Sequence, residues 1–298
     1  MEADRAAVAT GDGFSFDECV SVCDVCGGTA FSPVAPRANV VECEECGYRF
    51  VTPRPSQSQI AGAYSDPHFY DGWIDDESGR IQMWSKRLDF IRMHVAAHHL
   101  LDIGAGIGTF LALARDRAHW SVCGTEVSLS AVQEARERYG LSLRVGQVEE
   151  IGFSAGTFDL VTLWHVLEHV PSPRTLLRTC HDVLVPGGTL VVAVPNDSTV
   201  RARVSSVRGR MMGKGAPPTA VRYPLLQPGR EVHLSYFTEG VLRRLLASEG
   251  FETRLATVDD HYACPSPRTT AQVGAYRLLR RLTGINAGIA LLLIARRL

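Results

Sequence analysis

The sequence predicts an α/β fold in which a small zinc ribbon precedes a doubly wound, mostly parallel sheet of seven strands. Three observations carry this prediction. After His99, short apolar runs alternate with segments of helical period, as expected of a sheet with helices on both faces. A glycine-rich loop stands between the first of these strands and the first helix. Four cysteines have the spacing C-x2-C-x16-C-x2-C, which is typical of a four-thiolate zinc site.

The composition is that of an ordinary globular protein. The chain has 298 residues, of which 45% are hydrophobic and 21% charged, and its formal net charge is −1. This length suggests about two domains, and a wholly disordered chain is excluded. Residues 1–18 lack the apolar core of a signal peptide, and the apolar run 288–295 is too short to span a bilayer. We expect a cytoplasmic protein that binds neither membrane nor nucleic acid; its oligomeric state stays open.

The first two segments are a tail and the ribbon. Residues 1–18 mix small and polar residues without a period, and we expect a disordered tail. The ribbon follows at residues 19–55, where each CxxC pair places two sulfur atoms on one side of a tight turn. The predicted zinc ligands are Cys23, Cys26, Cys43 and Cys46. A disulfide framework is the alternative, but disulfides are rare in reducing compartments. Four protein ligands leave no open position for catalysis, so we expect a structural zinc.

Residues 56–98 are predicted to form a linker and a helical lid. The two prolines of the segment 52–56 oppose both helix and sheet pairing, and the apolar spacing then becomes helical. A longer helix is expected near Met83–Ala97. Between the helical stretches lies an aromatic patch made of His68, Phe69, Tyr70 and Trp73. This patch either packs against the main domain or covers a ligand.

The main domain is predicted at residues 99–298. Its strand candidates are Leu100–Ile103, Ser121–Glu126, Ser142–Val145, Phe158–Leu163, Gly188–Val194, Phe251–Val258 and Ile289–Ala295. Helices are expected at Thr109–Arg117, Leu129–Tyr139, Arg174–Leu184, Thr238–Glu249 and Ala271–Leu282. The pattern breaks into basic, Gly/Pro-rich sequence at about residues 196–232, which indicates an insertion. We expect the insertion to contact the substrate because it follows the fifth strand.

The glycine-rich loop predicts a nucleoside site. Gly104, Gly106 and Gly108 lack side chains, so the backbone can turn sharply and approach a ligand closely. Glu126 ends the second strand, where a carboxylate can accept hydrogen bonds from both ribose hydroxyls of an adenosine cofactor. The spacing G-x-G-x-G differs from the G-x-G-x-x-G of dinucleotide enzymes, which makes a pyrophosphate cradle less suitable.

These motifs resemble those of the class I S-adenosylmethionine-dependent methyltransferases, which have a Rossmann-like fold. The resemblance begins at about Leu100 and rests on Asp102-x-Gly-x-Gly-x-Gly108, Glu126, Phe158-Asp-Leu-Val161, Trp164-His-Val-Leu-Glu-His-Val170 and Pro186-Gly-Gly-Thr-Leu-Val191. The segment His233-Leu-Ser-Tyr-Phe-Thr238 resembles the small-molecule O-methyltransferase branch. The resemblance implies S-adenosylmethionine as cofactor, with the binding residues Asp102, Gly104, Gly106, Gly108, Glu126, Gln147, Val148 and Trp164. Relatives often carry an acidic residue for the adenine amine where this chain has Gln147, so Gln147 or the main chain must take that role.

The segment Trp164–Val170 carries the candidate catalytic residues. His165, Glu168 and His169 are spaced i, i+3 and i+4, so a helix there would place them on one face. One hypothesis makes His165 or His169 the general base for the acceptor hydroxyl. A second places a divalent ion on these three residues and His233, since H-x-x-E-H with a later His resembles the metal-holding pattern of small-RNA 2′-O-methyltransferases and some quinone O-methyltransferases. A third gives Glu168 and one histidine only a bracing role.

The predicted function is methyl transfer to a small-molecule acceptor, at a hydroxyl of a saccharide-containing or secondary metabolite. A ribbon ahead of this domain resembles tailoring methyltransferases of saccharides and natural products. An RNA methyltransferase with a ribbon recognition lobe is one alternative, which the nearly neutral charge disfavours. A non-catalytic, ribbon-based interaction protein is another, which the intact glycine loop and Glu126 disfavour.

Overall fold

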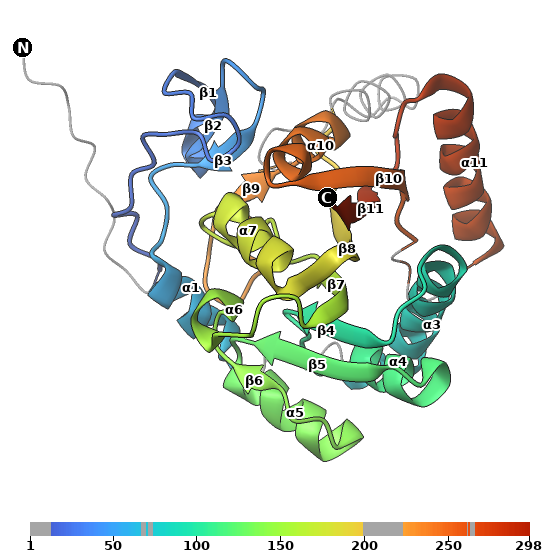
Figure 1. Ribbon diagram of the computed structural model, residues 1–298. Coiled ribbons are helices and arrows are strands. Elements are labelled where there is room, and N and C mark those ends of the chain that lie inside the picture. The colour runs from blue at the N-terminus through green and yellow to red at the C-terminus, as the bar shows by residue number, and fades with distance from the viewer. Residues whose placement is uncertain (1–12, 67–69, 71–73, 199–222, 261, 263–265) are drawn as a thin grey trace, which may run out of the picture.

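The computed structural model describes residues 13–66, 70, 74–198, 223–260, 262 and 266–298, which form two sheets and the helices around them (Figure 1). The central sheet has seven strands in the order β10-β11-β8-β7-β4-β5-β6. These strands are β4 (His99–Ile103), β5 (Ser121–Glu126), β6 (Arg144–Val145), β7 (Phe158–Trp164), β8 (Leu184–Pro195), β10 (Phe251–Val258) and β11 (Ala290–Arg297). Strand β11 is antiparallel to β8 and β10, and the other pairs are parallel. The predicted fold class is therefore confirmed.

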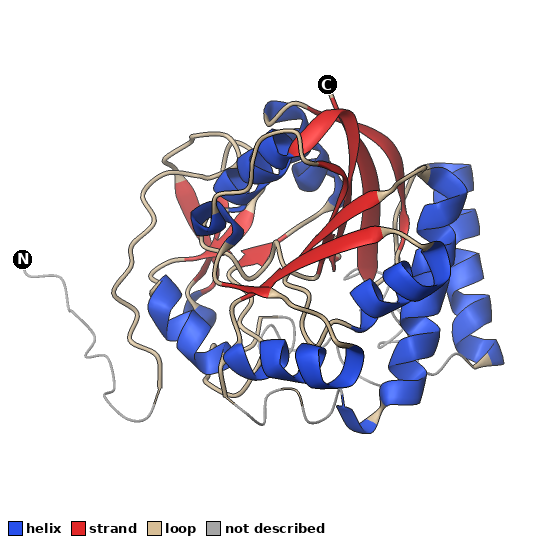
Figure 2. Ribbon diagram, turned by 60° about the horizontal axis from the view of Figure 1, so that its bottom comes forward, coloured by secondary structure: helices blue, strands red, loops and turns tan. Residues whose placement is uncertain are grey.

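Helices cover both faces of the central sheet (Figure 2). Helices α7 (Pro173–Val183) and α10 (Glu239–Ser248) share one apolar cluster with Leu101. On the other face, α3 (Glu77–His94), α4 (Thr109–Ala118) and α5 (Leu129–Tyr139) share a second cluster with Leu100. Consecutive residues of a strand point to opposite faces. Leu100 and Leu101 therefore belong to two separate cores, as a doubly wound sheet requires.

Side-chain caps determine where several helices begin. Ser128 accepts a hydrogen bond from the Ala131 amide at the start of α5, and Thr238 does the same for Val241 at the start of α10. Such caps satisfy amide groups that have no partner within the helix. The sequence placed both helix starts within one residue of those observed.

Some boundaries differ from the prediction. The strand predicted at Ser142–Val145 is reduced to Arg144–Val145, which lies at the edge of the sheet and pairs only with β5. Helix α3 begins at Glu77, well before Met83, because its first turns are polar and give no apolar signal. Helix α11 (Pro267–Thr283) begins at a Ser266 cap, before the predicted Ala271.

The ribbon strands belong to a second, antiparallel sheet. Strands β1 (Phe31–Ala35), β2 (Val40–Cys43) and β3 (Arg49–Val51) are joined by β9 (Ser235–Tyr236), which comes from the C-terminal half of the chain. A short 3₁₀ helix, η1 (Pro36–Ala38), connects β1 and β2. Phe50 pairs with Ser235, and its side chain belongs to the same apolar cluster as Phe237 and α10. The ribbon is thus packed into the main domain.

Several predicted segments lie partly outside the described residues. Residues 199–222 of the insertion, residues 1–12 of the tail and most of the aromatic patch are among them. Of the predicted tail, Phe14 is buried beside Val51, and Glu18 forms an ion pair with Arg54. Within the part of the chain that is described, no helix is both long and apolar enough to cross a membrane.

Candidate functional site

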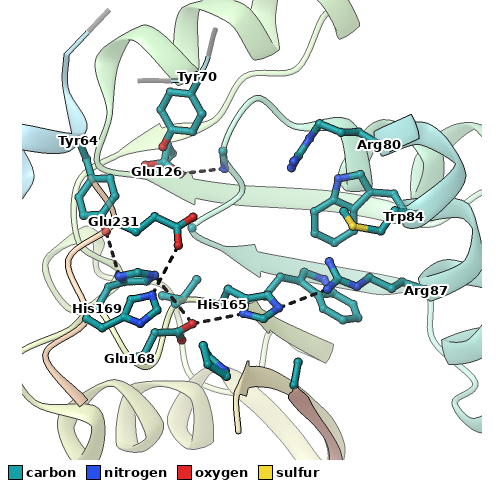
Figure 3. Close-up of a pocket in the computed structure, with 18 of the residues that line it drawn as sticks. Tyr64, Tyr70, Arg80, Trp84, Arg87, Glu126, His165, Glu168, His169 and Glu231 are labelled. Carbon is teal, nitrogen blue, oxygen red and sulfur yellow. Dashed lines mark hydrogen bonds and ion pairs between the residues drawn. The ribbon is translucent and has the colours of Figure 1, made fainter. Parts of the chain in front are cut away.

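Two adjoining cavities open where the parallel strands end, which is where ligands bind in open α/β sheets. The larger has a volume of about 500 Å³ and is shown in Figure 3. The smaller, of about 100 Å³, lies against helix α1 (Gln57–Tyr64). Both are lined by Tyr64, Gly104, Glu126 and His169. A ligand can therefore extend from one cavity into the other.

The glycine loop between β4 and α4 forms one wall of the larger cavity. Gly104 and Gly106 line it and have positive φ angles of 70° and 54°. A Cβ atom on Gly104 would come within 2.6 Å of a methyl group of Val166. Glycine at these positions thus brings the backbone to the cavity without strain or a clash.

Two residues of the predicted cofactor-binding set, Gly108 and Asp102, do not line the cavities. A Cβ atom on Gly108 would come within 2.8 Å of Leu141, so Gly108 allows α4 and α5 to pack closely. Asp102 is buried and accepts a hydrogen bond of 2.6 Å from Thr162 on the neighbouring strand, and burial raises its pKa to about 7. Neither residue is among those that line the two cavities.

Glu126 lines both cavities at the end of β5. Its Oε2 accepts a hydrogen bond of 2.8 Å from the Gly106 amide, and its Oε1 accepts two, of 2.8 and 3.0 Å, from the amides of Val127 and Ser128. Burial raises the pKa of Glu126, and these three bonds act against that rise. These bonds occupy three of the roughly four acceptor positions that a carboxylate offers. The predicted bonds to the two ribose hydroxyls stay a prediction.

The smaller cavity is mostly apolar. Gln147 and Val148 line it from the start of α6 (Val148–Ile151), and Ile60 and Ala61 line it from α1. Gln147 and Val148 thus lie at a cavity next to Glu126, and their contact with the cofactor stays a prediction. Helix α1 belongs to the segment predicted as a lid, and its residues line this cavity.

The far wall of the larger cavity holds a buried cation that the sequence did not indicate. Arg87 is 4% exposed, and its guanidinium carbon lies 4.6 and 4.7 Å from the ring centres of Trp84 and Trp164. Its charge is balanced by Asp259, to which it donates two hydrogen bonds. The ion pair and the two cation–π contacts hold the Trp164 ring in the cavity wall.

The segment after β7 is a turn, so the helix that would place His165, Glu168 and His169 on one face is not formed. His165 has a left-handed backbone conformation with φ 55°, which an α-helix of L-residues does not accommodate. The turn closes through a hydrogen bond of 2.9 Å from the His169 amide to the Val166 carbonyl. It still brings His165 Nδ1 to 3.3 Å from Glu168 Oε1.

His165 lies between the buried carboxylates of Glu168 and Asp259. Figure 3 shows its contact with Glu168 and a second one, of 3.3 Å, between its Nε2 and Nη2 of Arg87. His165 Nε2 is 3.5 Å from Asp259 Oδ2, and its Nδ1 faces Glu168. Burial lowers the pKa of His165, and nearby Arg87 does the same, but the two carboxylates outweigh them and raise the pKa to about 9. His165 is therefore cationic at neutral pH. An imidazolium has no lone pair with which to accept a proton, so His165 is unsuited to act as a general base.

His169 has the opposite character. Its Nδ1 lies 2.7 Å from the Val232 carbonyl oxygen, which only accepts hydrogen bonds, so Nδ1 carries a hydrogen. Burial lowers the pKa of His169, although Glu168 acts in the other direction. The neutral ring then presents a bare Nε2. Of the two histidines in the turn, His169 is the one able to accept a proton.

Glu168 forms a cluster with His169 and His233. One ligand atom of each residue lies within 4.8 Å of the others, and His165 is not part of this group. Glu168 is 1% exposed, and its two oxygens accept no hydrogen bond of good geometry from the described residues. Burial raises the pKa of Glu168, but the neighbouring His165 and His169 lower this pKa by more than burial raises it. The carboxylate is therefore ionised. The predicted four-residue metal set is thereby reduced to three, because His165 is tied to Asp259.

The four ribbon cysteines come together near the end of β2. The Sγ atoms of Cys23 and Cys46 are 3.5 Å apart, as are those of Cys26 and Cys43, and all four lie within 4.8 Å of one another. Zinc with Zn–S bonds of about 2.3 Å would separate the sulfurs by roughly 3.8 Å. The cluster therefore has the dimensions of a tetrathiolate site, and no pair is a disulfide.

Several cavity residues carry no signal in the sequence. They are Tyr64, Arg80, Arg87 and Glu231, together with Asp259, which pairs with Arg87. The first three precede the glycine loop, and the other two follow the fifth strand. They meet at the site only through tertiary packing, so spacing alone does not identify them.

A sequence profile described as a methyltransferase domain matches residues 75–256, more than half of the chain. The chain belongs to this family. The predicted class I S-adenosylmethionine-dependent methyltransferase domain is thus confirmed, and the two cavities lie where its strands end.

Curated relatives of this methyltransferase chain include enzymes named ubiquinone biosynthesis O-methyltransferase. The one from Xanthomonas campestris pv. campestris strain B100 is 30% identical over 145 residues, which cover 46% of this chain and 60% of the relative. The one from Xanthomonas oryzae pv. oryzae strain PXO99A is 34% identical over 119 residues, or 37% of this chain and 49% of the relative. The matches thus span about half of these relatives.

Solved structures of methyltransferases share the fold. A chain in the complex between the Haloferax volcanii Trm112 methyltransferase activator and a methyltransferase superposes with a TM-score of 0.51 at 18% identity, covering 80% of this chain and 97% of that one. An S-adenosylmethionine-dependent methyltransferase from Listeria monocytogenes gives a TM-score of 0.50 at 15% identity, covering 74% of this chain and 98% of its own. At these identities the likeness concerns the fold alone.

Proposed function

We propose that the protein transfers the methyl group of S-adenosylmethionine to a hydroxyl of a small molecule. One arrangement carries this proposal: the glycine loop and Glu126 line the same cavity as the bare Nε2 of His169. Family membership and relatives named as O-methyltransferases support it. Bound S-adenosylmethionine would supply an electrophilic methyl group on its sulfonium.

The two cavities suit different parts of the cofactor. The small apolar cavity at Gln147 and Val148 fits a flat, apolar base, and the free acceptor position of Glu126 fits a ribose hydroxyl. Gly104 and Gly106 would lie along the methionine part. These residues therefore form a continuous path from one cavity into the other.

Arg80 would hold the cofactor carboxylate. It lines the larger cavity (Figure 3), and although burial lowers its pKa to about 10, it remains a cation at neutral pH. Replacing Arg80 with glutamine is expected to weaken S-adenosylmethionine binding by about tenfold, since a hydrogen bond between charged groups is lost. Calorimetry with decarboxylated S-adenosylmethionine is the check, because that analogue should bind the variant and the parent equally. An equal loss for both ligands would remove this role, and Arg92→Gln on the exposed side of the same helix is the control.

His169 would take the acceptor proton. As the acceptor oxygen attacks the methyl group, its hydrogen moves to Nε2 of His169, and the imidazolium that forms lies beside ionised Glu168. The Nε2 atom is 3.9 Å from Glu168 Oε1, so the new charge gains a partner within the site. His165, already cationic, would instead attract developing negative charge on the acceptor.

A divalent cation at Glu168, His169 and His233 is a second candidate for the same cluster. A buried carboxylate without hydrogen bonds and a bare imidazole nitrogen are both good metal ligands. They face each other as two acceptors, which a cation between them would stabilise.

Metal analysis separates the general-base hypothesis from the divalent-cation hypothesis. About one metal per chain, bound in the ribbon, favours His169 as a general base. A second equivalent whose removal stops turnover favours a divalent cation at the cluster.

The acceptor class follows from a direct assay. Phenols, sugars and natural-product glycosides incubated with methyl-labelled S-adenosylmethionine should show label transfer to one class, with saccharide-containing or secondary metabolites expected. Transfer to RNA but to no small molecule would favour the RNA methyltransferase. No cofactor binding at all would favour the non-catalytic interaction protein.

The ribbon cluster is proposed to hold a structural zinc ion. Elemental analysis is expected to find about one zinc per chain, and Cys43→Ser should lower both zinc content and the melting temperature, because a site with three thiolates binds zinc less tightly. Cys19→Ser is the matched control, since Cys19 is exposed and outside the cluster. Four titratable thiols and no zinc in protein prepared without chelators would contradict the proposal.

A further inference from the structure

Tyr64 connects the helix that covers the cofactor cavity to the catalytic turn. It is the last residue of α1, and its side chain lines both cavities. Its hydroxyl lies 2.9 Å from Nδ1 of His169, and the two rings meet edge to face at 5.7 Å (Figure 3). The helix thus contacts the proposed base through one side chain.

The tyrosine hydroxyl lies between Val232 and His169 and contacts both. The Val232 amide donates to Tyr64 Oη at 3.0 Å, and the Val232 carbonyl accepts from Nδ1 of His169 at 2.7 Å. Tyr64 therefore holds Val232, the residue whose carbonyl keeps the hydrogen on Nδ1. Because a neutral imidazole carries only one hydrogen, a hydrogen held on Nδ1 leaves Nε2 bare toward Glu168.

We infer that Tyr64 is a positioning residue, which fixes the tautomer of His169 and links it to occupation of the cavity under α1. The inference rests on the proposed role of His169. Gln57, Ile60 and Ala61 of the same helix line the small cavity. The adenine base of the cofactor, bound there, contacts α1 and so steadies the Tyr64 hydroxyl against Val232. Cofactor binding then prepares His169, the general base, before the acceptor arrives.

The test is Tyr64→Phe, which keeps the ring and removes only the hydroxyl. Histidine side-chain ¹⁵N NMR of the intact protein, with and without S-adenosylhomocysteine, needs no known acceptor. In the parent we expect His169 to be the Nδ1–H tautomer, more completely so with the ligand bound. In the variant we expect a mixture of tautomers that the ligand no longer shifts. Ligand affinity should change by less than about twofold, because no bond to the ligand is lost.

Turnover gives a second readout. We expect kcat of Tyr64→Phe to fall about three- to tenfold, which is the rate equivalent of one neutral hydrogen bond. The KM for the cofactor should be unchanged, and the acid limb of the pH profile should be displaced. Tyr276→Phe on α11, which contacts neither cavity, is the control. A parental tautomer ratio and pH profile in Tyr64→Phe would overturn the inference. Full activity in His169→Ala would instead overturn the proposed base, so the two failures are distinguishable.

Discussion

With His169 replaced by alanine, kcat is expected to fall by about 10²–10⁴, the usual contribution of a general base. The affinity for S-adenosylmethionine should stay nearly constant, because no contact between His169 and the cofactor is proposed. The partners of His169 are Val232, Tyr64 and Glu168. Labelled methyl transfer to an acceptor found in the assay measures the first quantity, and calorimetry the second. His94→Ala, an exposed histidine on α3, is the matched control.

The pH profile distinguishes the two histidines of the turn. The base must be neutral, and burial keeps the pKa of His169 below the ordinary value of about 6.5. We therefore expect kcat/KM to be flat near neutral pH and to decrease only as the pH falls through that lowered pKa. If His165 were the base, the rate would instead rise with pH through about 9, where His165 loses its proton. Such a rise, abolished by His165→Gln, would contradict the assignment to His169.

Glu126→Ala is expected to reduce S-adenosylmethionine affinity by about ten- to a hundredfold. The substitution removes a hydrogen bond to a charged acceptor, a contribution of roughly 1.5–3 kcal/mol. It also frees the amides of Gly106, Val127 and Ser128, which lose the carboxylate that organises the loop. We therefore expect the loss of affinity to be nearer a hundredfold than tenfold. Titration calorimetry with the cofactor is the measurement.

Controls separate ligand recognition from damage to the fold. Glu150→Ala removes an exposed carboxylate near the same sheet edge and should leave affinity unchanged, since Glu150 lines neither cavity. Gly106→Val should bind at least as weakly as Glu126→Ala, because a branched residue is strained at φ 54° and would project into the cavity. Unchanged affinity in both Glu126→Ala and Gly106→Val would refute the site.

The regular part of the fold follows from local sequence. Strand β10 was predicted at its observed bounds and α5 likewise, because apolar period and caps agree there. The N-terminal half of α3 was not predicted, since its first turns are polar and its core contacts, such as Trp84 and Arg87, come from tertiary packing. The ribbon was expected as a separate lobe. Its pairing with β9 joins residues remote in sequence, which no local pattern encodes.

The site was predictable where one short motif supplies it. Glu126, Gln147 and His169 line the cavities and the four cysteines form one cluster, while their roles toward cofactor, acceptor and metal stay predictions. The distinction between His165 and His169 was not available, because it depends on Asp259 and on the Val232 carbonyl. Both partners come from distant segments, and only the fold shows which nitrogen each of them faces.

The four-stranded sheet can be completed only late in synthesis. Tyr48, next to β3, bonds to Ser235 of β9 across 187 residues, which take roughly ten to forty seconds to translate. During that interval β3 has one open edge beside the apolar Phe50 side chain, and such edges attract strands of other chains. Truncations that end before Ser235 leave this edge open permanently. A free-standing ribbon cut from this chain is therefore a candidate for aggregation.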